Sequence, residues 1–143
     1  METISLPAGL GELLSRLLLA TALGCIIGIN RELNETPAGL RTHSLVALGS
    51  GLLTLIGVIL ALGTPPADSA ALSRVMQGLL AGIGFIGGGV ILQRSHDRAS
   101  HALTTAASVW VAAAIGITTA VGKIAHSHAA PAPTSTPASR FPT

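Results

Sequence analysis

Four apolar stretches separated by short polar segments dominate the chain: Leu13–Ile29, Leu45–Leu62, Val75–Leu92 and Ala102–Gly122. Few polar residues interrupt them, and each approaches the length of about 20 mostly apolar residues that a helix needs to cross the hydrocarbon core of a bilayer. A helical bundle in water would need a polar outer face, which these stretches do not provide. The pattern predicts an all-α fold, a polytopic transmembrane bundle of four helices.

Polar and helix-breaking residues suggest where the first two helices begin and end. The first helix is expected to begin near Leu10. Glu12 and Arg16 lie one turn apart near its start, a spacing that favours an ion pair on the helix surface. The second helix is expected to end at about Leu62, because the Pro65-Pro66 pair that follows cannot continue a helix.

The composition of the chain changes after the fourth stretch. Residues 10–123 form the predicted transmembrane domain. Residues 124–143 are rich in Pro, Ala, Ser and Thr and have no apolar period. A segment of this kind cannot bury a core, so we predict a disordered tail.

Composition narrows the class of function. Hydrophobic residues make up 49% of the chain and charged residues 10%, against about 25% charged residues in soluble domains. The net charge is +2 without a run of like charges, and aromatic residues make up 2%, so we expect no nucleic acid partner. No nucleophile, base and acid form a catalytic constellation, so we expect neither an enzyme nor a cofactor.

The short loops indicate the orientation in the membrane. Loops 30–43 and 93–101 together hold Arg31, Arg41, Arg94 and Arg98. The loop between the second and third stretches has no Lys or Arg. Because short cytoplasmic loops carry an excess of these residues, we expect loops 30–43 and 93–101 in the cytoplasm and both termini outside.

The third stretch contains a glycine-rich motif of the form G-x-G-x-x-G at Gly82, Gly84 and Gly87. A dinucleotide fingerprint must follow a strand, open a helix and face water. This motif lies in the middle of an apolar span, so we reject that interpretation.

Two other interpretations of the glycines stay open. Small residues four positions apart let helices approach closely in lipid, and such pairs occur here at Gly24/Gly28, Gly78/Gly82 and Gly84/Gly88. Alternatively, the helix loosens around Gly87–Gly89, and its freed backbone groups line a polar cavity, as in the discontinuous helices of transporters.

Polar side chains are dense between the first and second stretches. Arg31 and Arg41 could bind lipid phosphates or carboxylates. Glu32, Glu35 and His43 could contact a cation, although carboxylates without fixed geometry are weak evidence for a magnesium site. The plain alternative is a solvated loop at the membrane interface.

Hydroxyl and amide groups also occur at the ends of the later stretches. Thr104, Thr105 and Ser108 could bond their own helix or a neighbouring one. Arg74 and Gln77 lie at the head of the third helix, where Arg74 could extend its charged end to the interface.

Five segments occur in order along the chain: Gly24–Glu32, Ala38–His43, Ser73–Gly78, Gly82–Gly89 and Leu103–Trp110. Together they resemble the membrane domain of the MgtC/SapB family of bacterial inner-membrane proteins, over about residues 12–122. The resemblance implies functional residues among Arg31, Glu32, Arg41, Thr42, His43, Arg74, Gln77, Gly82, Gly84, Phe85, Gly87, Thr104, Thr105 and Trp110.

The chain departs from the family pattern at several points. The family usually has an acidic residue at the position of Asn30, often an aspartate at that of Ala71, and commonly an Arg-Gly pair at that of His101-Ala102. We also expect the tail to stand where relatives have a fifth membrane helix and, in many members, a cytoplasmic domain.

The resemblance implies a role in survival under low magnesium and, in some pathogens, in growth inside host cells. Family members look more like regulators of other membrane proteins, the ATP synthase among them, than like magnesium pumps. Three hypotheses follow: a regulator that docks another membrane protein or a second copy through its small-residue faces, a transporter or channel for a small cation such as Mg²⁺, and a truncated, inactive member. Whether Mg²⁺ binds at all stays open.

Overall fold

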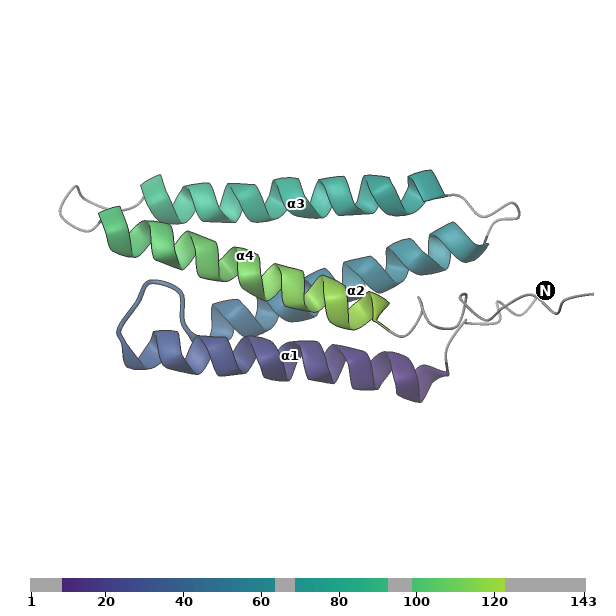
Figure 1. The fold of residues 1–143 in the computed structure, drawn as a ribbon, viewed down its shortest axis with the longest axis horizontal. Helices are drawn as coiled ribbons and strands as arrows, with labels where there is room; N and C mark the ends of the chain where they lie inside the picture. Colours follow the sequence, from purple (N-terminus) through teal and green to yellow (C-terminus); the bar gives the residue numbers. More distant parts are fainter. Residues whose placement is uncertain (1–8, 64–68, 93–98, 123–143) are drawn as a thin grey trace, which may run out of the picture.

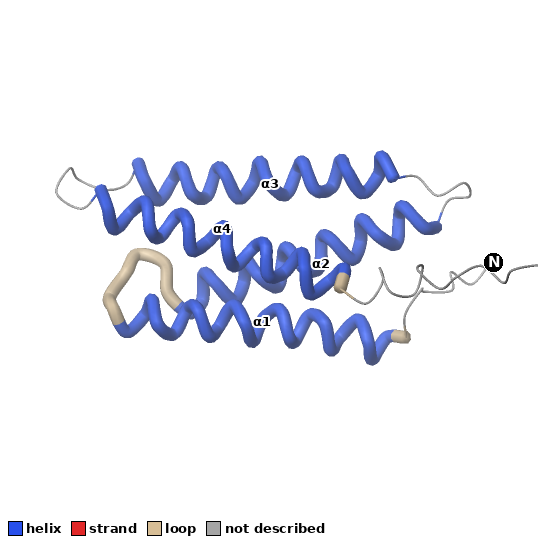
Figure 2. The backbone as a smooth tube through the Cα atoms, viewed as in Figure 1, coloured by secondary structure: helices blue, strands red, loops and turns tan. Residues whose placement is uncertain are grey.

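The computed structural model describes residues 9–63, 69–92 and 99–122. They hold four helices: α1 (Leu10–Leu33), α2 (Leu40–Gly63), α3 (Ser69–Leu92) and α4 (Ala99–Val121) (Figure 1). No strand occurs among these residues (Figure 2). All four helices are long and apolar enough to cross a membrane. The predicted all-α transmembrane bundle of four helices is confirmed.

Some of the predictions fall on other parts of the chain. The tail at 124–143, Arg94 and Arg98 lie outside the described residues. The domain boundary at residue 123 and the disorder of the tail therefore stay predictions.

The first connection is shorter than the predicted loop at 30–43. Helix α1 continues to Leu33 and α2 begins at Leu40, so only residues 34–39 are not helical. With 24 residues in α1, a rise of about 1.5 Å per residue gives roughly 36 Å, longer than the hydrocarbon core of about 30 Å. The last turn of α1 can therefore carry polar side chains and remain helical.

Successive helices run in opposite directions, so the bundle has two ends. The last turn of α1 meets the first turns of α2 and α4 at one end, at the left of Figure 1, which we name the Arg31 end. The start of α1 and the end of α4 meet at the other end, which we name the Glu12 end. Helices α1, α2 and α4 pack against one another, while α3 packs on α2 and α4.

Small residues fill the interface between α1, α2 and α4. The side chains of Ala20, Ala47 and Ala112 are fully buried. Lipid tails are as apolar as the helix surfaces, so association inside a membrane depends on close van der Waals packing. Small side chains permit that packing because they let the backbones approach.

Glycines mark the closest approaches within this three-helix unit. A Cβ atom added at Gly116 of α4 would overlap the carbonyl oxygen of Ala47 and lie 2.9 Å from the amide nitrogen of Gly51. One added at Gly24 of α1 would lie 2.8 Å from the Cβ of Ala47. One added at Gly28 would lie 2.5 Å from the Cα of Leu40. The structure thus places the predicted packing glycines Gly24 and Gly28 against α2.

Helix α3 is not loosened around Gly87–Gly89, contrary to the second interpretation of its glycines. It is continuous from Ser69 to Leu92, through Gly87–Gly89. Near the Glu12 end it packs closely on α2, where a Cβ atom at Gly57 would lie 3.2 Å from the Cβ of Val75. A continuous α-helix uses its interior carbonyls in its own hydrogen bonds, so these glycines free no carbonyls to line a cavity.

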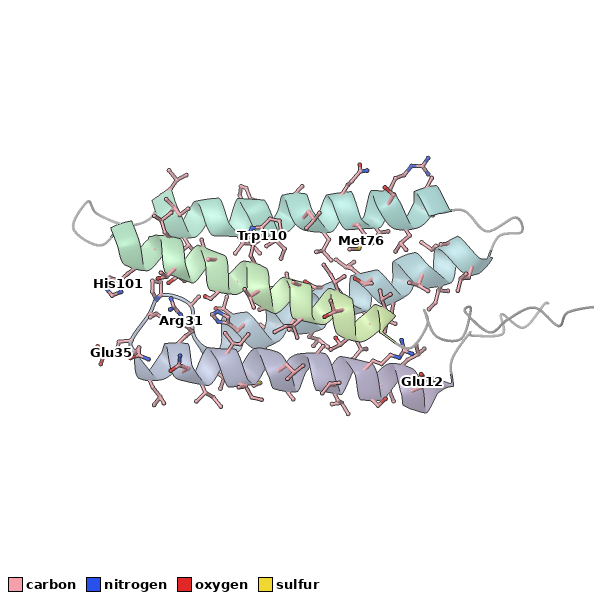
Figure 3. The ribbon with its side chains drawn as sticks, viewed as in Figure 1. Glu12, Arg31, Glu35, Met76, His101 and Trp110 are labelled. Atoms are coloured by element: carbon pink, nitrogen blue, oxygen red, sulfur yellow. The ribbon has the colours of Figure 1, made fainter. Side chains whose placement is uncertain are left out.

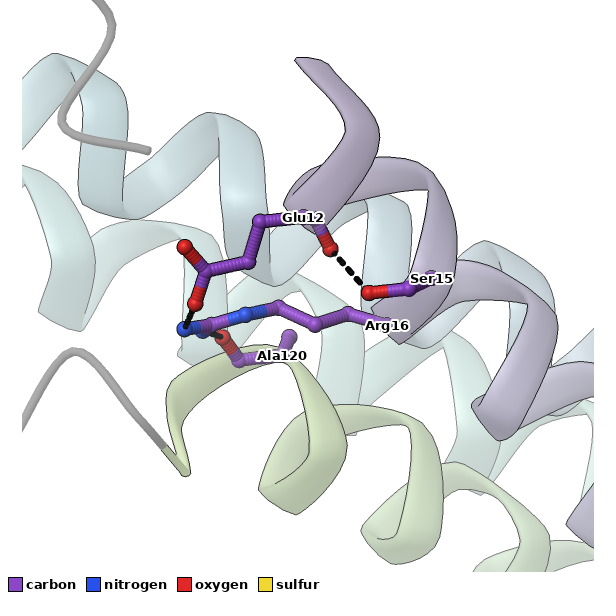
Figure 4. Close-up of polar contacts among 4 residues, drawn as sticks. All are labelled: Glu12, Ser15, Arg16 and Ala120. Atoms are coloured by element: carbon purple, nitrogen blue, oxygen red, sulfur yellow. Dashed lines mark hydrogen bonds and ion pairs between the residues drawn. The ribbon is translucent and has the colours of Figure 1, made fainter. Parts of the chain in front are cut away.

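The expected surface pair of Glu12 and Arg16 is instead part of the helix packing (Figure 4). Arg16 is 7% exposed. Its guanidinium binds the Glu12 carboxylate at 2.7 Å and donates a second hydrogen bond to the carbonyl of Ala120 in the last turn of α4. A cation is favourable at a helix C-terminus, where carbonyls lack partners within the helix. The pair therefore fastens α1 to α4.

Candidate functional site

A polar junction joins α1, α2 and α4 at the Arg31 end; we define it as Arg31, His43, Thr105 and Ser108. Arg31 reaches from the last turn of α1 and donates a hydrogen bond of 2.7 Å from its Nη2 to the hydroxyl of Thr105 (Figure 3). Thr105 is fully buried and donates its own proton to the carbonyl of His101, also at 2.7 Å. One threonine hydroxyl thus links two helices.

His43 forms the second link of the junction and is fully buried. Its Nδ1 lies 2.8 Å from the carbonyl oxygen of Gly39, and its Nε2 lies 2.9 Å from the hydroxyl of Ser108. A carbonyl can only accept, so Nδ1 carries a proton. Ser108 also lies 2.8 Å from the carbonyl of Thr105. The Ser108 hydroxyl has one proton and can donate it to Nε2 when the His43 ring is neutral. When both ring nitrogens carry protons, Nε2 donates to the hydroxyl, and the hydroxyl donates to the carbonyl of Thr105.

The short connection between α1 and α2 is held by its own polar groups. The Glu32 carboxylate accepts a hydrogen bond of 2.8 Å from the backbone N–H of Leu40, the first residue of α2. Thr36 donates at 2.8 Å to the carbonyl of Arg31. A Cβ atom at Gly39 would overlap the Glu32 carboxylate. These contacts fix the start of α2 beside the end of α1 and so place His43 and Arg31 in one junction.

The charge of Arg31 is only partly compensated within the part of the chain that the structure describes. Its Nε atom is buried and has no hydrogen-bond partner there. The negative end of the α1 dipole, close to Arg31, stabilises this charge. Chemically, such a group can hold a helix end in place or bind a carboxylate or phosphate.

Glu32, Glu35 and His43 do not form the cation site that their closeness in sequence suggested. Glu32 is engaged by Leu40, and His43 points between the helices toward Ser108. The described ranges contain no group of three or more His, Cys, Asp or Glu residues placed to hold a metal ion.

Several predicted residues lie away from the junction. Arg41 is exposed and Thr42 half-buried in the first turn of α2. Arg74 and Gln77 are exposed in the first half of α3, toward the opposite end of the bundle, where Gln77 bonds the hydroxyl of Ser73 at 3.2 Å. Thr104 is exposed on α4.

Helix α3 presents its glycines in two directions. At about 100° per residue, Gly87 lies on the side that packs against α4, where its Cβ position is 3.6 Å from Ala106. By the same count, Gly84 and Gly88 lie about 60° and 100° around the helix from Gly87, turned away from the buried residues Leu79 and Ile83. Together with Ala81 and Phe85 they form what we call the outer face of α3.

The outer face meets nothing else in the described chain. No atom lies within 4 Å of a Cβ position at Gly84 or Gly88. The same is true at Gly78 and Gly82, which lie toward α2. Phe85 is 85% exposed, and Trp110 on α4 is 43% exposed. The predicted glycine packing on α3 therefore has no partner among the other described helices.

Sequence reasoning missed the link between His43 and Ser108. It gave His43 either a contact with a cation or a place in a solvated loop, and it allowed Ser108 a bond to a neighbouring helix without identifying the partner. The only sequence signal is the Ser108-xxx-Ala112-xxx-Gly116 spacing, which marks the face of α4 that is turned inward. Nothing near His43 in the sequence shows that its ring lies opposite that face.

Comparison with known proteins finds relatives along most of the chain. A sequence profile described as the MgtC family matches residues 17–134. SrpB of Synechococcus elongatus is 46% identical over 125 residues, 81% of this chain and 68% of SrpB. SapB of Bacillus subtilis is 38% identical over 113 residues, 78% of this chain and 48% of SapB. YhiD of Escherichia coli, provisionally named a magnesium transporter, is 39% identical over 108 residues, 74% of this chain and 49% of YhiD.

The matched region thus spans about two thirds of SrpB but only about half of SapB and YhiD. No solved structure matches the chain.

Proposed function

The chain belongs to the MgtC family of multi-pass membrane proteins, and on this premise we propose that it regulates another membrane protein by docking one of that protein's helices on the outer face of α3. The setting we propose is adaptation to low magnesium, in the bacterial inner membrane. A second copy of the chain is the alternative partner, because it too would offer an apolar helix to this face.

One observation carries the proposal: Gly84 and Gly88 of α3 meet no other part of the described chain. In a helix interior a glycine is less favourable than alanine by about 1 kcal/mol. At Gly24, Gly28 and Gly116 a close helix neighbour offsets this cost, because no larger residue fits there. At Gly84 and Gly88 the described part of the chain offers no such neighbour. A helix from another protein would supply it.

The burial of the helices supports the same proposal. Only 17% of the apolar span of α3 is buried within the chain, against 44% for α2. Phe85 and Leu92 are among the most exposed large apolar side chains, at 85% and 87%. In a membrane, lipid covers such surfaces, so exposure alone does not call for a partner. The outer face of α3 does call for a partner, because its glycines permit a close backbone approach that lipid cannot use.

In this proposal the polar junction keeps the rest of the bundle in one arrangement. It ties α1, α2 and α4 together, so that α3 is the helix left available for docking. We further propose that the Arg31 end of the bundle lies in the cytoplasm. Arg31 and Arg41 are both at this end, and short cytoplasmic loops are rich in arginine.

Complementation with matched variants tests the proposal. The full chain and its Gly84→Leu variant are expressed in a strain that lacks its own MgtC family protein and is grown under magnesium limitation. We expect the wild type to restore growth and to co-purify with a stoichiometric partner or a second copy from mild detergent. Gly84→Leu should lose both. The control is Ala22→Leu, a similar enlargement at an exposed position of α1, which should behave as wild type.

Two results would contradict the proposal. A strictly monomeric wild type without a partner excludes docking. Full activity of Gly84→Leu at normal membrane levels excludes the outer face of α3 as the docking surface.

Transport of a small cation is the second candidate, favoured by the provisional name of YhiD. Purified chain in sealed proteoliposomes loaded with a magnesium-sensitive dye decides it. Uptake of Mg²⁺ above that of protein-free vesicles would support transport. The absence of uptake would remove this candidate and leave the regulator.

A further inference from the structure

Helices α2 and α3 touch near the Glu12 end and diverge toward the Arg31 end (Figure 1). Their contact is at Gly57 and Val75. Beyond it they leave a groove of about 440 Å³, lined on α2 by Leu45, Gly49 and Leu53 and on α3 by Gly82, Ile83 and Ile86. Ser50 is the one polar side chain that lines it. This groove is distinct from the outer face of α3.

The glycines of the groove leave room on both walls. No described atom lies within 4 Å of a Cβ position at Gly49 or at Gly82. A larger residue at either position would therefore project into the groove without meeting a neighbour. The glycines therefore leave this part of the groove unfilled by side chains of the described residues.

Arg41 lies one helical turn before Leu45, the residue of α2 that lines the groove nearest the Arg31 end. It continues the row Leu45–Gly49–Leu53 at the same spacing of four residues, which on a helix keeps side chains on one face. Helical side chains lean toward the N-terminus of their helix. The exposed guanidinium of Arg41 is therefore carried outward, toward the membrane interface.

We propose that the groove between α2 and α3 binds one acyl chain of an anionic phospholipid, whose phosphate is bound by Arg41. The apolar lining suits a hydrocarbon chain, and the cation one helical turn before it suits an anionic headgroup. The volume of about 440 Å³ lies in the range of about 300–1,000 Å³ that small-molecule sites occupy.

Lipid titration of the purified full chain, followed by native mass spectrometry from mild detergent, tests this site. The probes are phosphatidylglycerol, the zwitterionic phosphatidylcholine, and inorganic phosphate as a competitor without an acyl chain. We expect one phosphatidylglycerol to bind about fivefold more tightly than phosphatidylcholine, the factor expected from one basic side chain near an anionic group. Millimolar inorganic phosphate should not displace it.

Two variants separate the headgroup from the acyl chain. Arg41→Gln should abolish the preference for phosphatidylglycerol, whereas Arg74→Gln, which alters an exposed arginine toward the opposite end of the bundle, should keep it. Gly82→Leu should remove binding of both lipids, whereas Gly84→Leu should leave it intact. If Gly82→Leu lowers helicity or aggregates, Gly49→Leu tests the same groove from its other wall.

Each opposite result overturns the proposal. Unchanged binding in the groove variant excludes the groove as the site. An unchanged preference in Arg41→Gln excludes Arg41, and displacement by inorganic phosphate excludes a role for the acyl chain. These outcomes are independent of helix docking, because the docking variant Gly84→Leu is here a control that should bind lipid normally.

Discussion

Gly28 and Gly116 in the three-helix unit α1, α2 and α4, and Gly84 and Gly88 in α3, are the same residue type in opposite surroundings. At Gly116 and Gly28 an added Cβ atom would run into the backbone of α2. At Gly84 and Gly88 it would meet no described atom. The first set is explained by packing inside the chain. The second is not explained by any contact within the described chain; in the proposed function, a helix docked on α3 explains it.

The comparison shows how a membrane bundle can separate stability from recognition. The three-helix unit combines close backbone contacts with the polar junction at one end and the Glu12–Arg16 contact to α4 at the other. Helix α3 has close contacts mainly near Gly57 and Gly87. Enlarging Gly28 or Gly116 should therefore destabilise the first region, whereas enlarging Gly84 should leave α3 folded and, in the proposed function, unable to dock.

Gly116→Leu should have the largest effect on stability. The new side chain would meet the carbonyl of Ala47 and the backbone of Gly51, neither of which can turn aside. We expect the free energy of unfolding to fall by about 3 kcal/mol, near the upper end for overpacking. Titration with denaturing detergent, followed by circular dichroism, measures it. A loss below 1 kcal/mol would contradict the close approach of α2 and α4.

Thr105→Val should lower the free energy of unfolding by less than Gly116→Leu does. Valine keeps the shape of the side chain but removes the hydroxyl that accepts from Arg31, which leaves the guanidinium without its partner. We expect a loss of about 1.5 kcal/mol, between the values for a bond to a charged group and for a typical bond between membrane helices. Thr104→Val, at the exposed neighbouring position, is the matched control and should cost clearly less. Equal losses would argue against the junction.

Gly84→Leu should change stability in the opposite direction. Leucine has the higher helix propensity and meets no described atom at this position, so the free energy of unfolding should stay the same or rise by up to about 1 kcal/mol. The same detergent titration measures it. A fall of 2 kcal/mol or so would mean that the outer face of α3 is packed within the chain.

Ser108→Ala should have the smallest effect. It removes the partner of His43 Nε2, a bond of 2.9 Å between α2 and α4. The average contribution of such a bond is about 0.6 kcal/mol, since the unfolded state in a membrane also finds partners. Ser73→Ala, at an exposed position of α3 where the hydroxyl accepts from Gln77 of the same helix, is the control and should cost less.

The sequence was sufficient for the four helices because length and hydropathy alone determine which segments can cross a bilayer. It also identified Gly24 and Gly28, since their spacing places both on one face. It could not identify Gly51 and Gly57 as contact points. Helix α2 is apolar on nearly every side, so its sequence does not show which face meets a neighbour.

The polar junction was harder to predict for a different reason. Arg31 and His43 lie in a polar stretch that resembles an exposed loop. They became helical and inward-facing because α1 and α2 extend beyond the apolar runs. The partners Thr105 and Ser108 lie more than 60 positions away in sequence, and only the packing of α4 brings them close.

Photo-crosslinking in the native membrane tests the docking face of α3 most directly. Phe85, a residue of the outer face, is replaced by the photoreactive analogue p-benzoylphenylalanine, and so is Leu18, a 70% exposed residue of α1, as the control. We expect irradiation to join position 85 to one protein, a partner or a second copy, and position 18 to lipid alone. Lipid adducts alone at both positions would contradict the docking of a helix on α3.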